Sequence, residues 1–145
     1  MTISELKSIV EKDLEIDSTE LGAEALRCPQ LHNKYMCFLM DEKHNLSLLE
    51  SMLKITERDK WLYYTGKMSE EDLKNKNWEP FELVIIKQDV DRFIEADKQY
   101  SDMVIKINQQ KEKVNYLENV IKMMSNRIWN IKSAIEWNKF TQGIS

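Results

Sequence analysis

The last third of the sequence, from about residue 97 to residue 141, restricts the fold more than any other part. Neither Pro nor Gly interrupts it. Two apolar rows recur in it at intervals of seven residues, and one row is displaced from the other by three. The rows are Ile107, Val114, Ile121, Ile128 and Ile135, and Met103, Leu117, Met124 and Ile131, with the polar Gln110 at the position between Met103 and Leu117. This a/d heptad pattern predicts one long, coiled-coil-like helix over residues 98–141, whose seam must be buried against other helices.

The seam has two interpretations. In the first, it holds several copies of the chain together, because Trp129 and Trp137 add apolar surface beyond the narrow stripe that a two-stranded coil needs. The candidate oligomerisation residues are Ile107, Val114, Leu117, Ile121, Met124, Ile128, Ile131 and Ile135. In the second, all of this apolar surface is core within one chain.

The length of 145 residues suits a single domain, residues 1–145, in which residues 1–97 form a helical part and residues 98–141 the long oligomerisation helix. Only three Gly and two Pro occur, and 32% of the residues are charged, as is typical of a helical protein with few tight turns. The longest apolar run is short and no secretory signal is apparent, so we expect a cytoplasmic protein. Cys28 and Cys37 then remain free thiols.

The upstream sequence predicts more helices. Apolar residues at helical spacing indicate a short helix over residues 3–14, and the polar residues 17–20 suit the start of a second that ends near Arg27. Pro29 predicts a break or kink near Cys28. A long helix over residues 30–64 then follows as the antiparallel partner of the C-terminal one, and Gly66 ends it.

The connection between the two long helices is less regular. Residues 68–73 suit one or two capped helical turns. Residues 81–86 are β-prone and allow one short strand, which either pairs between copies of the chain or is an extended packed segment. Asp97 is the candidate N-cap of the long helix, with Asp89 as the alternative. The predicted class is all-α, with two long antiparallel helices and short N-terminal helices.

Patterns typical of catalysis do not occur. Three Gly cannot form a phosphate-binding loop, and His32 and His44 are not part of a cluster with the spacing of metal ligands. Cys28 and His32 lie four residues apart, but no third group that would orient them is evident. We therefore expect a protein that is not an enzyme and that needs neither a metal nor another cofactor.

One cluster combines aromatic and basic residues. Its members are Lys54, Arg58, Lys60, Trp61, Tyr63, Tyr64 and Lys67. Bases of single strands stack on exposed aromatic rings, and basic groups bind phosphates, so the cluster is the candidate DNA-binding surface. The alternative is that the rings are core and the charges a solvated face. Because the net charge is −4, any nucleic-acid site must be local. The net-positive C-terminal helix, with Arg127, Lys132 and Lys139, is the other candidate surface.

Three segments resemble the UvsY-type recombination mediator proteins of T4-like phages. The first is residues 12–21, which contain Ile16-Asp17-Ser18-Thr19. The second is residues 58–67, with a basic-x-basic-apolar motif before Tyr63-Tyr64-Thr65-Gly66, and the third is residues 131–137, which are similar to the C-terminal helix of the forms from cyanobacterial phages. Arg58 and Lys60 reverse the Lys-x-Arg order of that motif, and Trp61 replaces its frequent Leu.

The resemblance implies a function. Such proteins bind single-stranded DNA as ring-like homo-oligomers, hexamers or heptamers, and Arg58 and Lys60 match the two DNA-contacting residues of the motif. They help a phage RecA-like recombinase to displace the phage single-strand-binding protein during DNA recombination, repair and replication in the cytoplasm of the infected bacterial host. The alternative is a structural coiled-coil adaptor that does not bind nucleic acid.

Overall fold

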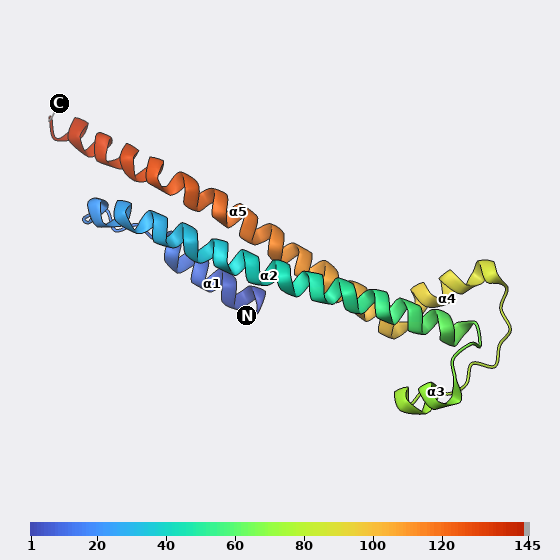
Figure 1. Ribbon diagram of the computed structural model, residues 1–145. Helices are drawn as coiled ribbons and strands as arrows, with labels where there is room; N and C mark the ends of the chain where they lie inside the picture. Colours follow the sequence, from blue (N-terminus) through green and yellow to red (C-terminus); the bar gives the residue numbers. More distant parts are fainter. Residues whose placement is uncertain (144–145) are drawn as a thin grey trace. The chain divides into compact units, whose positions relative to one another are not determined.

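The computed structural model describes residues 1–143, which are mostly helical (Figure 1). The elements in chain order are α1 (Ile3–Leu14), α2 (Leu21–Tyr64), α3 (Glu70–Lys76), the 3-10 turn η1 (Lys87–Asp89), α4 (Val90–Ala96) and α5 (Lys98–Thr141). Within this part of the chain no residue is in a β-strand. The prediction of an all-α protein with two long helices is confirmed.

The chain divides into two compact units, and both long helices contribute to each. The first unit contains residues 1–43 and the chain from Glu112 onward, and the second contains His44–Lys111. In both units the segments of α2 and α5 run antiparallel, since the partner position in α5 decreases as the position in α2 increases. In the first unit Glu24 pairs with Arg127 and Glu42 with Lys113. In the second, Thr56 contacts Met103 and Lys60 pairs with Asp97, the cap of α5.

The core of the first unit lies where α1, α2 and α5 meet. Its buried members are Leu6, Val10, Leu31, Tyr35, Leu117, Val120 and Met124. Thr2 begins α1 with a capping box, in which its side chain and that of Glu5 each bind the other's backbone N–H. At the other end of α1, the Tyr35 hydroxyl and the Lys34 ammonium both donate to Asp13 at 2.7 Å. Burial of the three-helix junction thus orders α1 on the two long helices.

Arg127 ties the end of α1 to α2. Its guanidinium donates to the carbonyl oxygens of Asp13, Leu14 and Glu15 at 3.1–3.2 Å and forms a short ion pair with Glu24. The exposed fraction of Arg127 is only 3%. The last carbonyl groups of a helix have no partner inside the helix. A buried arginine that binds them therefore supplies hydrogen bonds and also interacts favourably with the negative end of the helix dipole.

The predicted break near Cys28 is wrong, because α2 is continuous from Leu21 through Pro29 (Figure 1). A proline inside a helix loses one backbone hydrogen bond. Here Cys28, just before the proline, and Leu31, two residues after it, are both buried. Packing on both sides therefore holds the chain helical, and the second short N-terminal helix is instead the beginning of α2. Cys28 and Cys37 are free thiols, as expected.

The ends of the other helices agree with the predictions. Gly66, at φ +71°, ends α2 in a Schellman motif, since its N–H donates to Tyr63 and that of Lys67 to Leu62. Ser69 caps α3. Asp97 caps α5 by accepting a hydrogen bond from the Tyr100 N–H at 3.0 Å.

Residues 81–86 form neither a helix nor a strand within the chain, and their pairing between copies of the chain stays a prediction. They connect α3 to η1 without regular secondary structure. The described residues offer no second strand, so these residues cannot form a ladder within the chain. The Phe81 ring packs on Tyr64, while Leu83, Val84 and Ile86 are exposed. An apolar, extended segment thus lies at the surface of the second unit.

Candidate nucleic-acid interface

The last turns of α2 place three residues of the predicted DNA-binding set on one helix face. Lys54, Arg58 and Trp61 follow one another at i, i+4 and i+7, the spacing of neighbours on a helix, and all three are exposed. The Arg58 side chain is 68% exposed and Trp61 is 40% exposed. This face therefore offers two cations and one large ring to solvent.

Lys67 returns to the same face after the chain reverses at Gly66. Its ammonium lies 4.6 Å from the centroid of the Trp61 ring. No carboxylate lies within ion-pair distance of it among residues 1–143. A cation on an aromatic face that has no anionic partner is available to a phosphate. We call Lys54, Arg58, Trp61 and Lys67 the basic–aromatic face.

Lys60 has a different environment from its neighbours. It is 6% exposed, and its ammonium lies 3.1 Å from an Asp97 carboxylate oxygen and 3.8 Å from the centroid of the Trp78 ring. The Tyr64 hydroxyl donates to the same oxygen of Asp97 at 2.7 Å. Burial alone would raise the pKa of Asp97, but hydrogen bonds from Tyr64, the Tyr100 N–H and Lys60 together hold that pKa below its ordinary value. The Lys60 charge is thus neutralised inside the second unit.

Asp59 moderates the charge of Arg58. One of its oxygens accepts from the Arg58 guanidinium at 3.1 Å and the other from the Lys76 ammonium at 3.1 Å. Burial opposes ionisation of Asp59, but these two cations outweigh it and lower the pKa of the carboxyl. Arg58 keeps donors directed to solvent, because a guanidinium carries five N–H groups and most of this side chain is exposed.

Tyr63 and Tyr64 belong to a cluster of aromatic rings behind the basic–aromatic face. The rings meet at centroid distances of 4.9–5.8 Å, and the cluster contains Tyr63, Tyr64, Trp78, Phe81 and Phe93. The Tyr63 hydroxyl donates to the Glu79 carbonyl at 2.5 Å. Burial, together with the bond to Asp97, raises the pKa of Tyr64. Both tyrosines are therefore held by contacts within the chain and fasten the 78–81 segment to α2.

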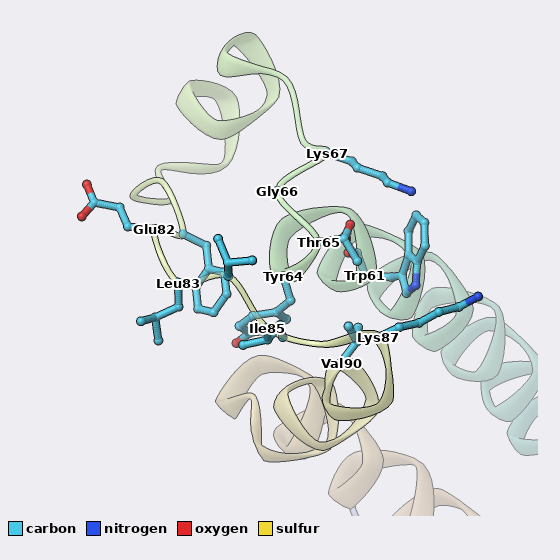
Figure 2. A pocket seen from close by; sticks show the side chains of 12 residues that line it. Trp61, Tyr64, Thr65, Gly66, Lys67, Glu82, Leu83, Ile85, Lys87 and Val90 are labelled. Atoms are coloured by element: carbon cyan, nitrogen blue, oxygen red, sulfur yellow. Dashed lines mark hydrogen bonds between the residues drawn. The ribbon is translucent and has the colours of Figure 1, made fainter.

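A pocket of about 470 Å³ opens beside Trp61 (Figure 2). The end of α2, the turn at Gly66 and the extended segment form its walls. Its lining includes Trp61, Tyr64, Lys67, Phe81, Ile85 and Lys87. In Figure 2 the side chains of Lys67 and Lys87 extend toward the side of the pocket that Trp61 occupies, whereas Glu82 and Leu83 point away from it.

The predicted oligomerisation residues divide by burial. Five are buried within the single chain: Ile107, Val114, Leu117, Met124 and Ile131. Ile121 and Ile135 are half-buried, and Ile128 is 40% exposed. Val120 and Arg127 are buried in their place. Because α1 adds a third helix to the junction, the buried stripe of α5 shifts toward these residues and leaves part of the Ile121–Ile128–Ile135 row accessible.

Several residues of the site did not stand out in the sequence. Asp97 was predicted only as a helix cap, yet it is also the anion that binds Lys60 and Tyr64. Trp78 and Lys87 were not predicted as site residues, because both follow α2 by more than ten residues, Trp78 in an irregular segment and Lys87 at the start of η1. The one available hint was the Trp78–Phe81 pair of aromatic residues in a stretch that is otherwise polar.

Comparison with known proteins gives the family. A sequence model described as "Recombination, repair and ssDNA binding protein UvsY" matches residues 9–144, nearly the whole chain. The chain belongs to the UvsY family. The UvsY family is described by recombination, repair and the binding of single-stranded DNA. This description favours a protein that binds single strands over a structural coiled-coil adaptor.

Solved structures support the UvsY fold. Three crystal forms of the bacteriophage T4 recombination mediator protein UvsY match at 18–20% sequence identity. Two of them have TM-scores of 0.83 and 0.84 and cover 97–98% of this chain and 98–99% of theirs. The third has a TM-score of 0.78 and covers 94% of this chain and 98% of its own. No curated protein sequence matches significantly.

Residues 1–143 contain neither a membrane-spanning helix nor a metal-binding cluster. None of the helices there is long and apolar enough to cross a membrane. No group of three His, Cys, Asp or Glu side chains in the same range is placed to hold a metal ion.

Proposed function

We propose that this chain binds single-stranded DNA through the basic–aromatic face, acts as a homo-oligomer, and promotes loading of a phage RecA-like recombinase onto strands covered by single-strand-binding protein. Family membership supports the binding of single strands, and the resemblance to recombination mediators supports the two protein partners. The observation that carries the choice of surface is the alignment of Lys54, Arg58 and Trp61 on α2, with Lys67 against the Trp61 ring.

The chemistry of this face suits a single strand. Arg58 and Lys54 lie one helical turn apart, so they can bind successive phosphates of a backbone that runs along α2. The exposed Trp61 ring offers a stacking surface that tolerates any base, which a duplex would hide from it. Since no set of side chains here is placed to read base edges, we expect little sequence preference.

Lys60, Tyr63 and Tyr64 do not belong to the basic–aromatic face but make contacts within the chain next to it. In the chain described, the Lys60 ammonium is buried against Asp97 and Trp78, and a phosphate would have to compete with that carboxylate. We therefore propose Lys60 as a positioning residue and Arg58 as a direct phosphate contact. The two tyrosines fix the end of α2, from which Trp61 and Lys67 project.

The proposed oligomer uses the apolar surface that α5 does not bury within the chain. Ile128 is 40% exposed, Trp129 63%, Trp137 64% and Phe140 75%, and the last two rings stack at 5.7 Å. Exposed aromatic residues are typical of protein interfaces. A ring of six or seven copies, as the resemblance implies, would repeat the basic–aromatic face and multiply a weak contact.

Replacing Arg58 with alanine should weaken binding of a single strand by at least tenfold, because the loss is repeated in every engaged subunit. The slope of log affinity against log salt should fall by about 0.7 for each phosphate that the variant no longer binds. Fluorescence anisotropy with a labelled oligonucleotide across a salt series measures both. Lys7→Ala is the matched control, since Lys7 is an exposed lysine of α1 in the other unit.

The same two variants test the proposed mediator function. With single strands covered by single-strand-binding protein, Arg58→Ala should lose stimulation of the recombinase's DNA-dependent ATPase, whereas Lys7→Ala should retain it. Equal DNA affinity and salt slope in both variants, with assembly intact, would place the DNA surface elsewhere.

Replacing both Trp137 and Phe140 with serine should reduce assembly. Both side chains are mostly exposed in the single chain, so the helices should persist, while loss of buried interface aromatics costs about 2 kcal/mol or more. Sedimentation velocity at micromolar concentration measures the size, and circular dichroism checks the fold. Full-length protein that sediments as a monomer, or a variant that assembles as the parent does, would refute an α5-based oligomer.

A further inference from the structure

We propose that the pocket beside Trp61 is a nucleotide site, which takes one unstacked base of the bound single strand and binds the adjoining phosphate with Lys67 and Lys87. This inference rests on the proposed DNA function and adds a residue, Lys87, that lies outside the basic-x-basic motif. The volume of about 470 Å³ falls within the range of about 300–1,000 Å³ found for small-molecule sites.

The walls of the pocket suit the faces of a base. Trp61 supplies an exposed indole ring to the lining, and the extended segment supplies apolar side chains, among them Val84 and Ile85. Val84 is fully exposed in the chain alone. An unstacked base is typically held between aromatic and apolar side chains, so this lining fits its two faces.

The charges suit the phosphate that accompanies the base. Lys67 lies over Trp61 without a carboxylate partner, and Lys87 likewise forms no ion pair within residues 1–143. The one acidic residue in the lining, Glu82, points away from both lysines in Figure 2. Two unpaired ammonium groups beside an aromatic ring favour an anionic, planar ligand over a neutral apolar one.

Position along the chain connects the pocket to the proposed path of the strand. Lys54, Arg58 and Trp61 lie on one face of α2, and Trp61 is also part of the pocket lining. A backbone that follows the two cations thus reaches the pocket at the end of the helix. The turn at Gly66, whose positive φ favours glycine, brings Lys67 back to this point.

The test compares two probes of equal length, an oligothymidine and an abasic deoxyribose-phosphate strand, on the full-length protein. Trp61→Leu keeps an apolar side chain and changes no charge. It should lower affinity for oligothymidine about tenfold, the effect of losing stacking with a base, and leave affinity for the abasic strand unchanged. Lys87→Ala should weaken both strands and reduce the salt slope.

Lys74→Ala is the matched control, because Lys74 is an exposed lysine of α3 in the same unit and does not line the pocket. It should bind both strands as the parent protein does. The nucleotide site is refuted if Lys87→Ala behaves as Lys74→Ala, or if Trp61→Leu weakens both strands equally. In either case a loss of affinity in Arg58→Ala would leave the proposed DNA function intact, whereas a parent protein that binds neither strand would refute both.

Discussion

Replacing Asp97 with asparagine should destabilise the second unit by about 3–5 kcal/mol, because it leaves the Lys60 ammonium buried without an anion. The side chains of Lys60 and Asp97 are only 7% and 10% exposed, so water cannot replace the missing partner. Asparagine still caps α5 and still accepts a hydrogen bond, which confines the change to the charge. Denaturant unfolding followed by circular dichroism, at one fixed protein concentration, measures the loss.

The double variant Lys60→Met/Asp97→Asn is the control for this prediction. Replacing a buried ion pair by neutral side chains of similar volume is often neutral, so the double variant should recover most of the stability that Asp97→Asn loses. It also tests the role of Lys60 directly. If Lys60 positions the face, the double variant binds single strands nearly as well as the parent protein, whereas a loss as large as that of Arg58→Ala would make Lys60 a phosphate contact.

Low pH should reproduce part of the destabilisation that is expected for Asp97→Asn. The pKa of Asp97 in the folded chain lies below its ordinary value of 3.8. A carboxyl with a lowered pKa contributes stability that is present above about pH 4 and is lost as the pH falls through the lowered pKa. The unfolding free energy of Asp97→Asn should accordingly depend less on pH below about pH 4 than that of the parent protein.

Replacing Arg127 with methionine should destabilise the first unit by about 3 kcal/mol. The change leaves the buried Glu24 with only the more exposed Arg27 as a cation, at 3.1 Å, and removes the donors that bind the carbonyl groups at the end of α1. Lysine should rescue it poorly, since a single ammonium cannot reproduce the forked guanidinium. Unfolding of the variant and hydrogen exchange of α1 amides measure the two consequences.

Lys132→Ala is the comparison variant, because Lys132 is exposed on the same helix. It should leave stability unchanged. Lys132→Ala, compared with Arg58→Ala, also tests the net-positive C-terminal helix as a DNA surface. Arg127 is buried and so is not accessible to a phosphate. A strong loss of DNA binding in Lys132→Ala, with no loss in Arg58→Ala, would nevertheless move the DNA surface to α5.

The sequence by itself determined the helices that local chemistry encodes. Heptad spacing predicted a helix over residues 98–141, and α5 has those bounds. The turn at Gly66, the Asp97 cap and the helix over residues 3–14 also followed from local rules, since caps and turns depend on a few adjacent residues. The basic–aromatic motif pointed to the end of α2, and the resemblance it carried agrees with the family match.

Only the tertiary structure decided which of these residues face solvent. Pro29 did not end α2, because buried neighbours on both sides outweigh one missing hydrogen bond. Arg58 and Lys60 look equivalent in the sequence, yet Arg58 is exposed and Lys60 is paired with Asp97, which lies far along the chain. Likewise, packing of α1 on the two long helices shifted the buried stripe of α5 toward Val120 and Arg127. Burial and long-range pairing depend on which elements meet, and spacing along one helix cannot reveal that.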